Sequence, residues 1–278
     1  MTEWILWTGT VGMDKTVPQR IEAAIAGGYT HTSLSLHDVK VAEEQGTNAR
    51  ELGRMMRDQG VSPTVLDAIG NWLPSSKPRD PSRPTVEDGL AMAEDLEVRS
   101  VSLIGMRPSP LPIEELAEHF GVMCDRGAKI GVNVHIEFAP QSAIPSLTAA
   151  WDLVRLADRP NGGILFDTWH FFRSGSDIAM LDVIPGEKIM AVQISDATPE
   201  IDGTLYEDTL HRRRLPGDGC IDLPPIIRAL HRSGGLSLVG PETFSDELHA
   251  LGATDAAMTA SARERELFER VLGPGWND

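Results

Sequence analysis

Four side chains that can supply oxygen ligands follow strand-like segments in the second half of the sequence. They are Glu137, Asp167, Gln193 and Glu242. Apolar and polar residues alternate in each segment, so that Leu165 shares one strand face with Asp167. Carboxylate and amide oxygens are the ligands that Mg²⁺ and Mn²⁺ prefer in proteins. The pattern therefore predicts one divalent metal site per chain, formed where these four strands end.

The stretch GILFDTWHFFRSG places His170 and Arg173 shortly after Asp167. From this stretch alone two interpretations are open: a polar turn that caps the next helix, or part of a functional site. His135 shares a strand face with Glu137, and a single imidazole there is more typical of a hydrogen-bonded residue inside a barrel than of a ligand. For Arg173 a helix-capping or surface role is preferred.

Strand-like and helical segments alternate along the whole chain, and this alternation must position the ligands. Strands are predicted at residues 4–10, 31–38, 62–70, 98–106, 131–138, 162–170, 189–197 and 236–244. Helices are predicted at residues 17–29, 40–59, 84–97, 112–129, 145–158, 176–186, 222–233 and 246–271. Strands separated by helices pair in parallel through right-handed crossovers, and eight such units close a barrel.

The predicted fold is therefore α/β, a single-domain (β/α)8 TIM barrel over residues 1–278. The carboxyl ends of its strands meet at one end, where barrel enzymes carry their catalytic groups. An open doubly wound sheet is the alternative, but the first turn, TGTVGMDKT, lacks the G-x-G-x-x-G spacing of dinucleotide-binding folds. The proline-rich stretch at 73–84 is interpreted as a long loop after the third strand.

The composition excludes several kinds of partner. A formal net charge of −16 and a pI near 4.9 argue against a nucleic-acid surface and give no attraction to an anionic membrane. The apolar run in MTEWILWTGTVG is too short for a signal peptide or a membrane span, so a cytoplasmic protein is expected. Cys124 and Cys220 form no thiolate metal site and are expected to be small buried hydrophobic residues.

The last four strands and the segments after them carry the motifs HIEFAP, FDTWH, VQISDA, RRRLPGDGCIDLPPII and VGPETF. In these motifs the sequence resembles the sugar phosphate isomerase/epimerase superfamily, the xylose isomerase-like TIM barrels. The resemblance covers most of residues 130–245, whereas residues 1–130 agree only in the rhythm of strands and helices. It implies a metal held by a Glu, an Asp, a His or Gln, and a Glu after strands five to eight. These positions are Glu137, Asp167, Gln193 and Glu242.

The resemblance also implies residues that contact substrate. The D-x-x-H pattern falls on Asp167 and His170, with the histidine contacting substrate beside the metal. The arginine before the P-G-[DE]-G turn falls on Arg213, whose guanidinium can hold a substrate oxygen or anion. Gln193 departs from the epimerases that use histidine and matches branches such as hydroxypyruvate isomerases and 3-dehydroshikimate dehydratases.

Four further residues are candidates for lining the mouth of the barrel and binding substrate: His37, Trp72, Arg107 and Trp169. Aromatic rings at such positions can pack on a ring or apolar face of a substrate. Packing in the protein core is the competing explanation for the two tryptophans.

These residues predict a divalent-metal-dependent isomerase or epimerase of a small, sugar-like hydroxy-carbonyl compound, acting through a metal-stabilised enediolate. Glu137 and Glu242 would serve as metal ligands and, together with His170, as catalytic residues, the two carboxylates forming the acid/base pair. The alternatives are a metal-dependent dehydratase, a lyase, of a cyclic hydroxy-ketone such as a 3-dehydroshikimate or an inosose, and a noncatalytic metal-binding barrel. Endonuclease IV relatives share the fold, but this acidic chain lacks a basic groove.

The expected partner is a small polyol or keto compound, with no nucleic acid and no membrane. The sequence leaves open the exact substrate, the choice between isomerisation and dehydration, and the choice between Mn²⁺ and Mg²⁺. Whether the chain forms a homo-oligomer is also open.

Overall fold

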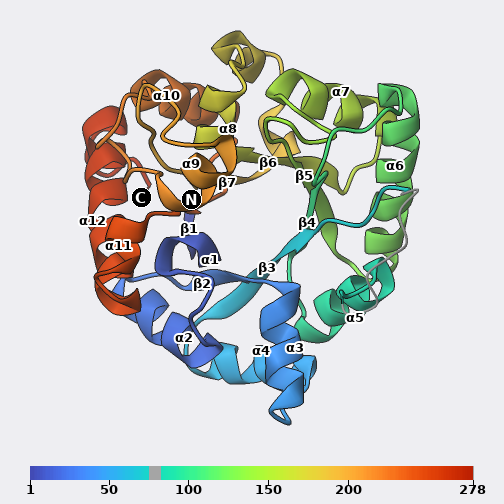
Figure 1. Cartoon of the computed structure of the whole chain (residues 1–278), viewed down its shortest axis with the longest axis horizontal. Helices are drawn as coiled ribbons and strands as arrows, with labels where there is room; N and C mark the ends of the chain where they lie inside the picture. Colours follow the sequence, from blue (N-terminus) through green and yellow to red (C-terminus); the bar gives the residue numbers. More distant parts are fainter. Residues whose placement is uncertain (75–82, 278) are drawn as a thin grey trace.

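The computed structural model describes residues 1–74 and 83–277, and these form a closed barrel of parallel strands. Each strand pairs with its neighbour in sequence, and the last strand closes the barrel onto the first (Figure 1). The strands are β1 Glu3–Leu6, β2 His31–Leu34, β3 Ser62–Ile69, β4 Ser100–Ile104, β5 Asn133–Glu137, β6 Gly162–Asp167, β7 Ile189–Ile194 and β8 Leu238–Pro241. The predicted (β/α)8 TIM barrel is confirmed.

Helices surround the barrel, with α2 packed against α12 where the ring of helices closes (Figure 1). The helices are α1 Thr8–Val11, α2 Val17–Ala26, α3 Leu36–Glu44, α4 Ala49–Asp58, α5 Val86–Leu96, α6 Ile113–Lys129, α7 Leu147–Ala157, α8 Thr168–Arg173, α9 Leu205–His211, α10 Leu223–Ser233, α11 Asp246–His249 and α12 Ala253–Leu272. Two 3₁₀ helices, η1 Ile178–Asp182 and η2 Gly186–Lys188, precede β7. One apolar core joins the inner faces of these helices to the outward faces of the strands.

Several predicted boundaries are wrong because polar residues start new helices. The predicted helix at 40–59 is two helices, since Gly46 has a φ of 92° and the Asn48 side chain caps α4. The predicted strand at 162–170 ends at Asp167, whose carboxylate accepts the backbone N–H of His170 and caps α8.

Two segments between β6 and α10 also differ from prediction. The predicted helix at 176–186 consists of the 3₁₀ helix η1 followed by a turn at Pro185. Helix α9 lies in a segment where no helix was predicted, and a capping box formed by Thr204 and Glu207 begins it. This extra helix matters for the site because Arg213 follows it closely.

The lower part of the barrel lumen is filled by apolar side chains. They form a separate buried cluster of Ile5, Trp7, Val65, Leu165, Ala191 and Leu238. Leu165 and Ala191 lie two residues before Asp167 and Gln193 on their strands, so these polar residues form the next layer inside the lumen. The predicted alternation of strand faces is therefore confirmed, and below the polar layer the lumen holds this apolar cluster together with His135, which precedes Glu137 by two residues.

Two expectations from composition can be compared with the structure. Cys124 is buried as expected, but Cys220 is exposed, because it lies in the loop before α10 and not in an element. Within residues 1–74 and 83–277, none of the helices is long and apolar enough to cross a membrane. Most of the loop predicted at 73–84 lies outside the described residues.

Candidate metal centre and active site

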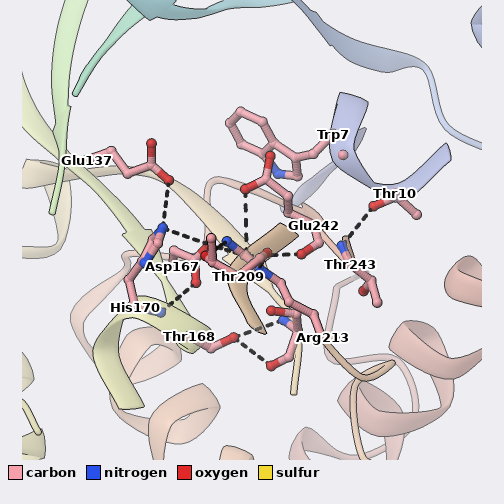
Figure 2. A network of polar contacts seen from close by, with 12 residues as sticks. Trp7, Thr10, Glu137, Asp167, Thr168, His170, Thr209, Arg213, Glu242 and Thr243 are labelled. Carbon is pink, nitrogen blue, oxygen red and sulfur yellow. Dashed lines mark hydrogen bonds and ion pairs between the residues drawn. The ribbon is translucent and has the colours of Figure 1, made fainter. Parts of the chain in front are cut away.

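Glu137, Asp167 and His170 form the tightest group of ligand-bearing side chains at the carboxyl ends of the strands (Figure 2). One ligand atom from each lies within 4.8 Å of the others, and all three residues are buried. His170 Nε2 is 3.4 Å from Glu137 Oε1 and 4.0 Å from Asp167 Oδ2. The strand ends of β5 and β6 and the first turn of α8 therefore bring together three of the residues singled out in the sequence.

Arg213 lies between Asp167 and Glu242 and is almost completely buried (Figure 2). Its Nη1 donates to Asp167 Oδ2 at 2.7 Å and to the Glu242 carbonyl at 3.1 Å, and it is 3.8 Å from Glu242 Oε2. Its Nε donates to the carbonyl of Thr209 in α9 at 2.9 Å. Arg213 thus links the carboxylate that ends β6 to the residue that follows β8.

Backbone hydrogen bonds fix the segment that carries Arg213. Arg214 and Asp196 exchange backbone hydrogen bonds of 2.8 Å, and the Arg213 N–H donates to the carbonyl of Phe244 at 3.0 Å. The Asp196 carboxylate accepts the backbone N–H of Gly217 in the PGDGC turn and that of Ile221, the residue after it. The segment is therefore held between extensions of β7 and β8, which positions the arginine inside the site.

Gln193 and Glu242 complete the predicted oxygen set. Gln193 is paired in register with Asp167 on β6 and with Gly240 on β8, and Glu242 follows β8 directly. Glu242 lies outside the tight group and is separated from Asp167 by the Arg213 guanidinium. Among the described residues, neither side-chain polar atom of Gln193 has a hydrogen-bond partner, although the residue is 1% exposed. A buried amide oxygen without a donor fits a cation.

The buried charges of the site are unbalanced. Burial raises the pKa of Glu242 well above its ordinary value; the Arg213 charge acts against this rise, and repulsion from Asp67, Glu137 and Asp167 adds to it. Burial also acts to raise the pKa of Asp167, but Arg213 and the hydrogen bonds to its carboxylate hold that pKa below its ordinary value. A divalent cation would relieve the excess of carboxylates, so the donor set and its charge both fit the predicted metal.

Asp67 is a further carboxyl group of the lumen that the sequence analysis missed. It lies two residues after Val65 of the apolar cluster in the lumen, on the inward face of β3. Burial and the charge of Glu137 raise its pKa to about 7. The alternation of Val65 and Asp67 in TVLDAIG is the signal that could have identified it, had the test of strand faces been extended to the third strand.

The raised pKa of Asp67 predicts a pH-dependent effect of Asp67→Asn in metal-free protein. Unfolded Asp67 ionises near 3.8, whereas the folded protein keeps the proton until about pH 7. Wild type should therefore lose stability relative to the variant as the pH rises from about 4 to about 7, and the difference should level off above that. Urea unfolding of both proteins with chelator, at pH values from 4 to 8, measures it, and a difference independent of pH would contradict the assignment.

Arg173 has a structural role, but it is neither a capping nor a surface residue, because its side chain is 5% exposed and is paired with a buried carboxylate. It donates to Asp208 of α9 at 2.7 Å and also contacts Thr198 and the carbonyls of residues 199 and 200. Its guanidinium lies 5.5 Å from the ring centroid of Trp169, and that of Arg213 lies 5.1 Å from the same centroid. Trp169 is 1% exposed, so its ring is buried in contact with both arginines.

The remaining candidates are less closely connected with the centre. Trp72 is buried in the main core and donates its indole N–H to the Ile104 carbonyl at 3.1 Å. His37 on α3 and Arg107 after β4 are exposed, and neither forms a hydrogen bond or ion pair with the ligand residues within the described part of the chain. A substrate contact through His37 or Arg107 stays a prediction.

His135 is confirmed as a hydrogen-bonded residue of the lumen. It is fully buried, and its Nε2 lies 3.0 Å from the Ser100 hydroxyl. Burial lowers its pKa to about 3, so the imidazole is neutral at physiological pH.

His170 should be needed for turnover more than for stability, because the hydrogen bond that begins α8 uses its backbone N–H and not its ring. We expect His170→Ala to reduce turnover about 100-fold, the effect of removing one donor from an active site, and to leave metal content unchanged. Elemental analysis, melting temperature and turnover measured together test this, with His119→Ala on α6 as the control. Loss of the metal would make His170 a ligand, and unchanged turnover would remove it from the site.

The fold and the site together define a TIM barrel with a cluster of potential metal ligands at the carboxyl ends of its strands. Residues 21–268 match the family model described as xylose isomerase-like TIM barrel. The chain therefore belongs to the xylose isomerase-like TIM barrel family, as its motifs in the last four strands imply.

Similar proteins include enzymes of two kinds. The chain is 26% identical over 269 residues to an inosose isomerase of Bacillus velezensis, covering 93% of both proteins. It is 25% identical over 245 residues to a 3-dehydroshikimate dehydratase of Pseudomonas aeruginosa, covering 87% of this chain and 38% of that protein. A crystal structure of the IolI protein with a bound zinc atom superposes with a TM-score of 0.82 at 22% identity, over 98% of this chain and 99% of that chain. The structural likeness supports the fold, and the two relatives agree with a catalytic barrel.

Proposed function

We propose that the chain is a divalent-metal-dependent isomerase or epimerase of a small hydroxy-carbonyl compound. The observation that carries the proposal is the buried, partly unpaired oxygen set at the carboxyl ends of β5 to β8, with an amide that no described residue satisfies. The inosose isomerase that covers 93% of this chain supports a cyclic polyol ketone as the substrate class.

The predicted metal ligands are Glu137, Asp167, Gln193 and Glu242. When bound, a divalent cation polarises neighbouring carbonyl and hydroxyl oxygens and makes the C–H bond between them more acidic. The all-oxygen set favours Mg²⁺ or Mn²⁺. Zinc is present in the IolI structure, so both kinds of ion belong in the test.

The chain's own residues then handle the proton. Glu137 and Glu242 come from β5 and from the end of β8, so their carboxyl groups approach the lumen from different sides. In the proposed isomerisation one of them takes the proton from the carbon next to the carbonyl, and the other returns a proton to the former carbonyl carbon. The hydroxyl proton passes to the former carbonyl oxygen in the same reaction. His170 Nε2, which lies beside Glu137, would donate a hydrogen bond to the substrate oxygen where charge develops.

Arg213 is proposed to orient the ligands. Its Nη1 holds Asp167 and its Nε is bonded to Thr209, so most of its hydrogen-bonding capacity is engaged within the protein. It therefore fixes the position of Asp167 and contributes positive charge to the site. Nη1 donates to Asp167 and to the Glu242 carbonyl, so a contact of Arg213 with substrate would use Nη2, whose contact with the Thr209 hydroxyl is long at 3.4 Å.

A dehydratase is the second candidate, and the match to a 3-dehydroshikimate dehydratase over 87% of this chain favours it. Both reactions begin with removal of a proton next to a carbonyl. They differ in the second step, because dehydration delivers the proton to a departing hydroxyl group and leaves a carbon–carbon double bond.

The test is an assay with inososes, 3-dehydroshikimate and simple ketoses in D₂O, with Mn²⁺, Mg²⁺ or Zn²⁺ and with chelator. We expect metal-dependent deuterium incorporation next to the carbonyl, followed by NMR, together with formation of an isomer. Ultraviolet absorbance of an unsaturated product would instead identify the dehydratase. Metal-loaded protein that produces neither deuterium exchange nor product from any of these compounds would contradict both candidates.

A further inference from the structure

One oxygen of the Asp67 carboxyl in the lumen is left without a hydrogen bond of normal geometry among the described residues. This oxygen, Oδ1, is buried. The charged groups that it senses are carboxylates, those of Glu137 and Asp167. The nearby cation, Arg213, is already bonded to Asp167. A buried carboxyl in such surroundings costs stability in the free protein, which points to a ligand that uses it.

Ser102 on the neighbouring strand β4 is a second buried polar group without a hydrogen-bond partner among the described residues. Its hydroxyl is completely buried and lies close enough to Asp67 to lower the pKa of that carboxyl. The two groups together offer an acceptor and a hydroxyl on one part of the lumen wall. Hydroxyl groups of a substrate match this pair, since each can donate to the carboxyl and accept from the serine.

Asp67 lies two strands away from Glu137 around the barrel, and its strand is the one opposite β7. It is on β3, whereas the four oxygen ligands come from β5 to the end of β8. Its strand nevertheless lines the same barrel, and the charge of Glu137 raises its pKa. A compound held by the metal side through one pair of oxygens would therefore present its other end to β3.

We propose that Asp67, supported by Ser102, binds a hydroxyl group of the substrate remote from the reacting carbons, and that the site consequently selects polyhydroxylated compounds. This inference rests on the proposed function, because it takes the reacting end of the substrate to lie at Glu137 and Glu242. Asp67 acts in it as a specificity-determining contact and not as a metal ligand.

The experiment measures metal binding and polyol binding separately. Wild type, Asp67→Ala and Asp67→Asn are titrated with Mn²⁺, and the Mn²⁺-loaded proteins are then titrated with myo-inositol, an unreactive polyol, by calorimetry. We expect the Mn²⁺ affinity to change by about 2-fold or less and myo-inositol binding to weaken about 10-fold or more in Asp67→Ala, the loss expected for a hydrogen bond to a charged group. Asp67→Asn keeps the shape and one acceptor, so it should lie between the two.

The matched control is Glu264→Gln. Glu264 is a fully buried acid whose carboxyl oxygens, like Asp67 Oδ1, have no hydrogen-bond partner among the described residues, but it lies on α12 outside the barrel. This variant should bind Mn²⁺ and myo-inositol like wild type. It separates the effect of the lumen position from the general effect of removing a buried carboxyl.

Three results would overturn the inference. A tenfold loss of Mn²⁺ affinity in both Asp67 variants would make Asp67 a metal ligand. Unchanged myo-inositol affinity in Asp67→Ala would remove the contact, and absence of myo-inositol binding by wild type would contradict selection for polyols. The deuterium-exchange assay distinguishes these results from failure of the proposed function, because wild-type exchange would persist in all three.

Discussion

Replacing Glu137 or Glu242 by glutamine is expected to abolish turnover. Each substitution removes a negative charge from the predicted metal and one of the two groups proposed to move protons, while the side chain keeps its shape. The loss of turnover should not result from unfolding. Because the pKa of Glu242 is raised in the folded chain, Glu242→Gln should melt at a higher temperature than wild type when metal is removed. Turnover, elemental analysis and melting with and without chelator measure these effects.

The control for both variants is again Glu264→Gln, which removes a buried carboxylate from α12. It should retain wild-type turnover. A near wild-type rate in Glu137→Gln or Glu242→Gln, with metal bound, would remove that residue from the acid/base pair. Full activity of the wild type in chelator would remove the metal from the mechanism.

Arg213→Met is expected to produce the largest loss of stability. Methionine fills part of the volume but leaves the buried carboxylate of Asp167 without its ion pair, and breaking such a pair costs about 3–5 kcal/mol. A divalent cation can compensate for the lost positive charge, so the loss should be greater in chelator than with saturating Mn²⁺. Urea unfolding in both conditions measures the difference.

Arg212→Met and Arg214→Met are the controls, because both side chains are substantially exposed and pair with exposed acids, Asp202, Asp246 and Glu247. Exposed ion pairs contribute about 0–1 kcal/mol, so both variants should be mild. If Arg213→Met were as mild as these two, the ion pair with Asp167 would have little importance for the fold.

The fold and most of the oxygen set could be predicted because they depend on local patterns. Alternation along single strands placed Glu137 on an inward face, and the periodic return of apolar segments gave the barrel. The same test applied to TVLDAIG would have found Asp67. The hydrogen-bond partners of Arg213 could not be predicted, because they depend on antiparallel bridges from Arg212 to Ser245 and from Arg214 to Asp196. These pairings join segments that are distant in sequence, and no local signal marks them.

The roles of the two arginines near Trp169 depended on the same long-range arrangement. Arg173 looked like a capping or surface residue, and the structure shows that it holds α9 through Asp208. Trp169 looked like a residue of the mouth, but it is buried, and the guanidinium groups of Arg173 and Arg213 both lie against its ring. The sequence shows only that Trp169 follows a strand. The side chains that cover Trp169 depend on the segment after β7, which carries Arg213.

An apolar cluster that includes Ile5, Val65 and Leu238 lies in the lumen beneath the ligand residues, towards the amino-terminal end of the barrel. Substrate, product and exchanging protons are therefore expected to reach the ligand residues from the carboxyl ends of the strands. A product molecule that stays in the site thus blocks the next substrate, so the product should act as a competitive inhibitor. The rate of product release sets an upper limit on turnover.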